Sequence, residues 1–157
     1  MIKEYFERIA MEHSMLRHSD AEPHFASSMD DAATLMARRL FYPAMFLDGG
    51  NFEVSGSDNS YLLNEDYTLA IVDHVKDSGN VKEVEQAFAQ TRVILRDIVG
   101  RMIRDKRKAL KPMVRFNASG IQGVRVELVE AGLYGWLLFL NIPEPLPTLN
   151  CNENLDS

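Results

Sequence analysis

The sequence predicts an α+β fold: a mostly antiparallel sheet of about four to five strands, with amphipathic helices packed on one face. Three observations predict it. Apolar residues recur with helical periodicity at the start and in the middle of the chain. Segments with strand-like alternation of apolar and polar residues form two groups. Short turns within each group favour antiparallel pairing. A length of 157 residues favours one domain, which we place at residues 1–146, followed by a flexible tail at residues 147–157.

Two amphipathic helices are expected before the first strand. The first spans residues 2–17, because Ile2, Phe6 and Ile9 recur at helical spacing. The second spans residues 29–40, where serines offer N-caps and two aspartates occupy the first turn. Each helix has an apolar side that can cover a sheet.

The first group of strands follows these helices. Residues 42–54 predict a strand, and residues 48–51 within it indicate either a hairpin turn or a bulge. Residues 55–60 predict a polar loop, and residues 67–75 a second strand. One face of this second strand carries Leu69, Ile71 and Val75.

A helix of about 25 residues is expected next, starting after the N-cap Asn80 and ending before Pro112. Its apolar stripe steps by four and three residues through Val84, Phe88, Thr91, Leu95, Ile98 and Met102. Three strands are expected after it, at residues 113–116, 123–129 and 134–142.

The charge of the chain is unevenly distributed. Residues 92–115 hold nine of the seventeen Lys and Arg residues and only two acids, although the whole chain has a net charge of −6. Such polarity attracts an oppositely charged surface, including that of another copy of the chain. The acidic overall balance argues against a dedicated nucleic-acid binder, while local contact with phosphate stays open.

Six bases of the long helix are the predicted interface for an oligomer or partner. Bases in a last turn complement the helix dipole, but these extend over about five turns. With the apolar stripe facing the core, they fall on two flanks. One flank holds Arg92, Arg96 and Arg107, and the other holds Arg101, Arg104 and Lys108.

Nothing in the sequence has a catalytic, cofactor-binding or metal-binding signature, so we predict a protein that is not an enzyme. His13, His18 and His24 have the spacing of no standard zinc site, and we interpret them as solvated surface residues. Cys151 lies in a polar tail and has no second cysteine to pair with.

An alternative function is a small ligand-binding domain or an unrecognised enzyme with a pocket between sheet and helices. Asp73, His74 and Tyr67 are its candidate residues. Adjacent strand residues point to opposite faces, so Asp73 and His74 need partners from elsewhere in the fold.

The N-terminus lacks the continuous apolar core of a signal peptide, and the longest apolar run is too short to span a bilayer. With its single cysteine, the chain is expected in an intracellular, reducing compartment.

The layout resembles the tail-terminator and tail-completion proteins of long-tailed bacteriophages and related neck proteins of prophages. The likeness lies in an N-terminal helix, a strand pair at residues 41–54 and 67–75, a long helix at residues 80–108, and the final run Tyr-Gly-Trp-Leu-Leu-Phe-Leu-Asn-Ile at residues 134–142. The helix at residues 29–40 and the acidic tail depart from this pattern.

The resemblance implies a non-enzymatic ring, commonly hexameric, that caps the tail tube and joins it to the head. The implied partners are further copies of the chain, tail-tube proteins and head-connector proteins, with incidental contact to passing DNA and none to a membrane. The implied location is the cytoplasm during assembly and then the virion.

Overall fold

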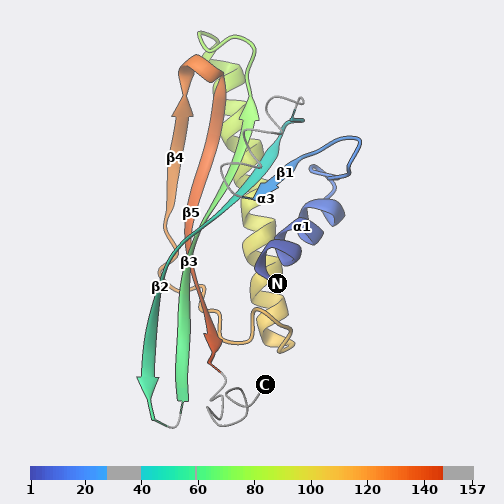
Figure 1. Cartoon of the computed structure of the whole chain (residues 1–157). Helices are drawn as coiled ribbons and strands as arrows, with labels where there is room; N and C mark the ends of the chain where they lie inside the picture. The colour runs from blue at the N-terminus through green and yellow to red at the C-terminus, as the bar shows by residue number, and fades with distance from the viewer. Residues whose placement is uncertain (28–39, 59, 147–157) are drawn as a thin grey trace, which may run out of the picture.

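The computed structural model describes residues 1–27, 40–58 and 60–146. Within them, the chain forms a five-stranded sheet in the order β1-β2-β3-β5-β4 (Figure 1). The strands are β1 (Phe25–Ser27), β2 (Ala44–Ser57), β3 (Ser60–His74), β4 (Gly123–Leu128) and β5 (Leu133–Pro145). Only β1 pairs in parallel, with β2, and the other three pairings are antiparallel. The predicted fold class is therefore confirmed.

Two helices, α1 (Ile2–Glu12) and α3 (Val81–Arg107), pack on one face of the sheet (Figure 1). The first ends at Glu12 rather than near residue 17, because His13 adopts an extended conformation and Arg17 has a positive φ of 49°. The helix expected at residues 29–40 and the tail expected at residues 147–157 lie outside the described residues.

The long helix α3 follows its prediction. The Asn80 side chain accepts hydrogen bonds from the backbone N–H groups of Lys82 and Glu83, which satisfies two donors of the first turn. Four residues of the predicted stripe are buried: Phe88, Thr91, Ile98 and Met102. The stripe also includes Ile94, which is fully buried, and α3 ends at Arg107, before Pro112, as expected.

The strands β2 and β3 are longer than expected. With one register shift, they pair as far as Ser57 and Ser60, so the polar loop expected at residues 55–60 is wrong. The pairing shifts register between Gly49 and Phe52, which identifies the irregularity at residues 48–51 as a bulge. The serine, glycine and acidic residues of this region do not alternate with apolar residues as in a typical strand. Their backbone groups nevertheless pair in the β-ladder.

This pairing builds a projection, which we call the arm: residues 49–57 of β2, 60–66 of β3 and 141–145 of β5. Its distal end extends past the ends of both helices (Figure 1). The burial of β2 stops at Leu47, and every residue of β2 after it is exposed. Apart from Ile142, which is buried in the main core, the arm is therefore held by strand pairing more than by core packing.

The core lies between the sheet and the two helices. The sheet contributes Met45, Leu69, Ile71, Leu138 and Leu140 from β2, β3 and β5. The helices contribute Phe6 and Ile9 from α1, and Ile94, Ile98 and Met102 from α3. A second, smaller cluster of Val75, Ala87, Phe88 and Tyr134 packs the first half of α3 against β5.

Two differences concern short segments. The strand expected at residues 113–116 is instead a pair of turns, whose Met113 and Phe116 side chains are fully buried in the main core. The parallel edge strand β1 was not expected, because three residues are too few to show a period. Within the residues that the structure describes, no helix combines the length and apolar character needed to cross a bilayer.

Candidate functional site: the basic face of α3

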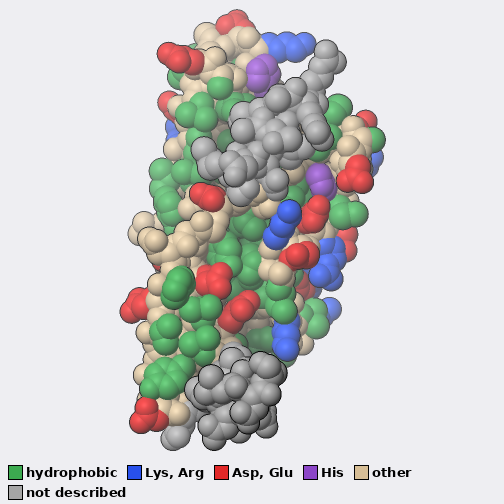
Figure 2. Space-filling model, viewed as in Figure 1, with side chains coloured by type: hydrophobic (Ala, Val, Ile, Leu, Met, Phe, Trp, Pro, Cys, Tyr) green, Lys and Arg blue, Asp and Glu red, His purple; other side chains and the backbone are tan. Residues whose placement is uncertain are grey.

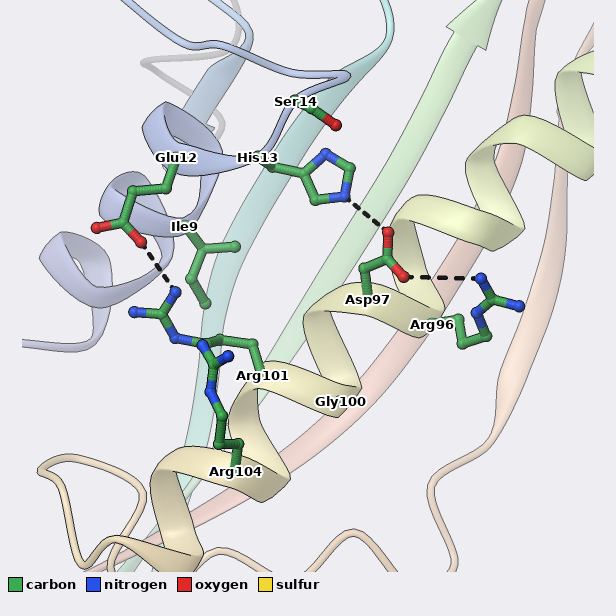
Figure 3. A pocket seen from close by; sticks show the side chains of 9 residues that line it. All are labelled: Ile9, Glu12, His13, Ser14, Arg96, Asp97, Gly100, Arg101 and Arg104. Atoms are coloured by element: carbon green, nitrogen blue, oxygen red, sulfur yellow. Dashed lines mark hydrogen bonds and ion pairs between the residues drawn. The ribbon is translucent and has the colours of Figure 1, made fainter.

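A groove of about 550 Å³ separates the end of α1 from α3 (Figure 3). Its sides are lined by charged and polar residues from both elements: Glu12, His13 and Ser14 from the α1 side, and Arg96, Asp97, Arg101 and Arg104 from α3. Gly100 lies between these α3 residues, and a Cβ atom placed on it would have no atom within 4 Å other than those of its chain neighbours and its own helix backbone. The groove is therefore open to solvent along α3 and rich in arginine.

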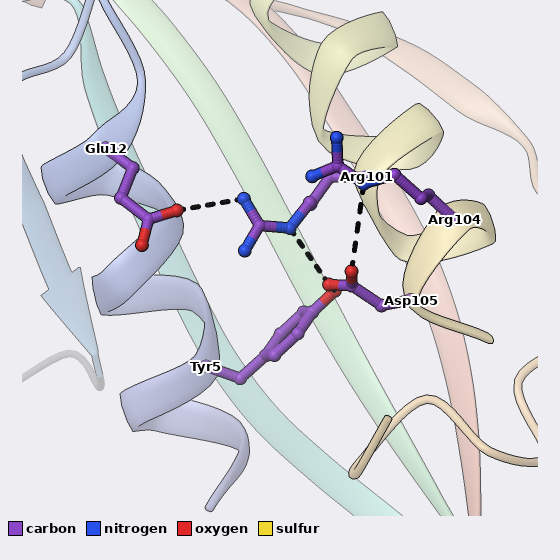
Figure 4. A network of polar contacts seen from close by, with 5 residues as sticks. All are labelled: Tyr5, Glu12, Arg101, Arg104 and Asp105. Carbon is purple, nitrogen blue, oxygen red and sulfur yellow. Dashed lines mark hydrogen bonds and ion pairs between the residues drawn. The ribbon is translucent and has the colours of Figure 1, made fainter. Parts of the chain in front are cut away.

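A buried polar network crosses from α1 to α3 beside this groove (Figure 4). The Tyr5 hydroxyl donates to Asp105 Oδ2 at 2.8 Å, and Arg101 Nε donates to the same oxygen at 3.0 Å. Arg101 Nη1 also reaches Glu12 Oε2 at 2.8 Å. Asp105 is only 3% exposed, so its carboxylate depends on these two donors.

The network raises the pKa values of two ionisable groups, Tyr5 and Arg101. Burial, and then the hydrogen bond to Asp105, raise the pKa of Tyr5 above its ordinary value, so its hydroxyl stays protonated as a donor. The hydrogen bond to Glu12 is the largest influence that raises the pKa of Arg101. Arg101 thus holds α1 against α3 within one chain, and the role of all six bases at an interface stays a prediction.

Arg96 and Arg104 are the most available charges of the groove. Their side chains are 77% and 57% exposed, and their ion pairs are long: 3.8 Å from Arg96 to Asp97 and 3.9 Å from Arg104 to Asp105. Pairs of this kind contribute little to stability. Both guanidinium groups can therefore turn to an outside carboxylate at small cost.

The remaining predicted bases lie at the helix end and on the opposite flank. Arg107 and Lys108 are exposed where α3 ends, and Lys108 is its C-cap residue. Arg92 lines a separate hollow of about 410 Å³ with Arg125 and Trp136. Arg96, expected beside Arg92 on one flank, lines the groove with Arg101 and Arg104 from the other.

The side chains of His13, His18 and His24 do not form one site. His13 Nε2 lies 3.1 Å from Asp97 Oδ2, and His24 Nδ1 donates to the carbonyl of Pro43 at 2.7 Å. His18 Nδ1 accepts from the backbone N–H of His24 at 3.0 Å, and burial lowers the pKa of His18. Their interpretation as solvated residues is wrong, since His24 is buried and the other two side chains are about 10% exposed. No group of three or more His, Cys, Asp or Glu in the described ranges is arranged to hold a metal ion.

The candidates for a sheet–helix pocket also lie apart. Asp73 accepts a hydrogen bond from the backbone N–H of His74, and burial raises its pKa. The Tyr67 hydroxyl is bound to the carboxylate of Glu65, near the middle of β3, whereas His74 is exposed at the end of that strand. These residues form no common site.

The contribution of α1 to the groove could not be read from the sequence. The spacing of Ile2, Phe6 and Ile9 shows which face α1 buries, but not which helix lies beside it. The stripe of α3 did contain a signal for Asp105, because Ile98, Met102 and Asp105 continue its steps of four and three.

Compared with family models, curated proteins and solved structures, the chain matches none. Fold and site together define the class of protein at a coarse level. Over residues 1–27, 40–58 and 60–146 it is an α+β protein with one mostly antiparallel sheet, two helices on one face, a projecting arm and an arginine-lined groove.

Proposed function

We propose that this chain is a structural, non-enzymatic ring component of a phage or prophage tail, of the tail-terminator or neck type. In this role it caps the tail tube and joins it to the head. It occupies the cytoplasm during assembly and the virion afterwards. The proposal combines the sequence resemblance with one structural observation, the separation of charge between the arm and the basic face of α3.

That separation is pronounced. Neither residues 40–75 nor residues 133–146, which contain the arm, include any Lys or Arg. The face seen in Figure 2 shows Asp and Glu without Lys or Arg over the region of the arm, whereas the side of the helices carries Lys and Arg together with Asp and Glu. A subunit with unlike surfaces in different places favours head-to-tail contacts, which close into a ring when the rotation between copies allows it.

Among the proposed partners, further copies of the chain are supported by this charge separation, and the others are implied by the resemblance. Further copies of the chain provide the ring contacts, and tail-tube and head-connector proteins bind the two rims of the ring. The exposed bases that the ring contacts leave free allow incidental contact with passing DNA. A membrane has no part in the proposal.

The test is the oligomeric state of the purified chain. We expect light scattering to give a multiple of the 17.8 kDa subunit mass, and negative-stain images to show rings. Salt near 1 M shortens the Debye length to about 3 Å, so charge-driven assembly should weaken at that concentration. A strictly monomeric chain at high concentration, with no binding to tail-tube protein, overturns the proposal.

A further inference from the structure

We propose that the arm of one copy docks on the groove between α1 and α3 of a second copy. This inference rests on the proposed ring and names its contact. Each copy then gives one arm and receives one, which is the arrangement of a head-to-tail ring.

The arm has the chemistry of an inserted acidic element. Its strands carry four acids and no Lys or Arg, namely Glu53, Glu65, Asp66 and Glu144, and Asp58 directly follows β2 at the tip. It also exposes apolar surface, since Phe52 is 69% exposed and Val54 is half exposed. Directly opposite residues share a face, so Phe52 and Val54 lie on the same face of the arm as their partners Glu65 and Leu63. Exposed apolar side chains among acids are typical of a contact surface.

The groove can receive carboxylates because its own acids are already engaged. Arg101 holds Glu12, and His13 holds Asp97 (Figure 3). Arg96 and Arg104 keep only long ion pairs, and both are exposed where they line the groove. The groove therefore offers two arginines to an incoming acidic segment, and guanidinium groups bind carboxylates well.

Several observations favour a second copy as the occupant. The acidic and the basic surface occur on one chain, in different places, so that identical copies are complementary. Exposed Met11 and Met15 lie in the sequence beside the groove residues Glu12 and Ser14. Methionine adapts to irregular apolar surfaces, and it can pack against Phe52 or Val54 of the arm.

A charge-swap experiment on the full chain tests the contact. We expect Arg96→Glu with Arg104→Glu to weaken self-association at least about tenfold near 0.1 M salt, because like charges then face each other. Glu53→Lys with Asp58→Lys should weaken it similarly. All four changes in one chain should restore the ring, since arm and groove are again opposite in charge. Arg101 is left intact because it holds the fold together.

The matched control is Lys76→Glu with Arg115→Glu, which changes the charge equally at exposed bases away from the groove. This control should keep the ring of the unaltered chain. Circular dichroism and thermal unfolding check that each variant folds. Light scattering and sedimentation measure the association.

The possible outcomes test the arm–groove contact separately from the proposed function. A ring that tolerates both double reversals overturns the arm–groove contact and leaves the proposed function standing. A strictly monomeric unaltered chain overturns the contact, and it overturns the proposed function as well if it also fails to bind tail-tube protein. Failure of the fourfold variant to restore a ring overturns the contact. The contact is also overturned if the Arg96→Glu, Arg104→Glu variant still forms the ring but no longer binds a short DNA duplex. The groove is then a DNA site.

Discussion

At the scale of single residues, the buried polar groups of α1 and α3 are matched to one another. Asp105 continues the apolar stripe of α3, and its carboxylate is buried with the Tyr5 hydroxyl and the Arg101 guanidinium as donors. Burial of a carboxylate is costly unless donors of this kind replace water. In the described residues, every buried side-chain nitrogen or oxygen has a hydrogen-bond partner. The network thus fixes α1 on α3 in one register.

Replacing Asp105 with Asn tests this network. The variant removes the charge opposite Arg101 and should lower the free energy of unfolding by about 1–3 kcal/mol, since Arg101 is partly exposed and keeps Glu12. Asp97→Asn is the matched control on the same helix. Asp97 is half exposed, and its replacement should cost less than about 1 kcal/mol. Urea unfolding measures both, and equal losses would contradict the role of Asp105.

We expect His18 to make the stability of the folded chain depend on pH. Its Nδ1 accepts the His24 backbone N–H, so it carries its proton on Nε2, and burial lowers its pKa in the folded state. Protonation therefore favours the unfolded chain, in which the pKa is near 6.5. The contribution of His18 to stability is complete above that pH and is lost as the pH falls below it. Glu7 faces the ring and partly opposes the shift.

His18→Asn separates this contribution from other titrations. The Asn Oδ1 can take the place of Nδ1 as acceptor, and it does not titrate. We expect the stability of the variant to change less than that of the unaltered chain between about pH 7 and pH 5. Thermal unfolding across this range measures the difference, and identical pH profiles would exclude His18 as the cause.

At the scale of elements, the helices and strands that could be predicted from the sequence were those with an amphipathic pattern. The α3 helix was predicted closely because its stripe, its N-cap and Pro112 all agree. The strands β4 and β5 were predicted within a few residues because apolar runs and turns bound them. Most of the arm was missed, because its polar residues are exposed and show no alternation. Its strand structure comes from pairing, which is not a local property.

The packing of β5 against β3 makes a prediction about Gly135. A Cβ atom at this position would lie 1.9 Å from the backbone oxygen of Ile71, so Gly135→Ala should destabilise the sheet by about 1–3 kcal/mol or more. Gly123→Ala on the edge strand β4 is the control, because the nearest atom to its Cβ is a Leu138 side-chain carbon at 3.6 Å. Denaturant unfolding should rank the two, and a tolerated Gly135→Ala would contradict this account.

At the scale of the whole molecule, core and arm have separate roles. The core buries α1, α3 and the middle of the sheet, whereas the distal arm adds exposed strand pairs and concentrated negative charge. Elements with little buried apolar surface contribute least to global stability. The arm is therefore available for contact with another molecule at little cost to folding.

Excision of the distal arm tests this division. We expect a chain in which Asn-Gly replaces residues 53–64, and so joins the paired residues Phe52 and Glu65, to fold with stability changed by less than about 2 kcal/mol. It should lose self-association, because the distal acids Glu53 and Asp58 and the exposed Val54 are removed. Thermal unfolding and light scattering measure the two effects. A shortened chain that still forms rings would contradict the role of the arm, and one that fails to fold would contradict its independence from the core.

The sequence by itself determined the α+β class, the long helix, the later strands and the block of positive charge. These follow from periodicity and composition, which are local properties of a chain. Only the tertiary structure decided that α1 lies beside α3, that Arg101 is engaged with Glu12 and Asp105, and that a basic groove and an acidic arm occur in one subunit. The reason is physical: contacts between residues such as Tyr5 and Asp105, a hundred positions apart, depend on how whole elements pack.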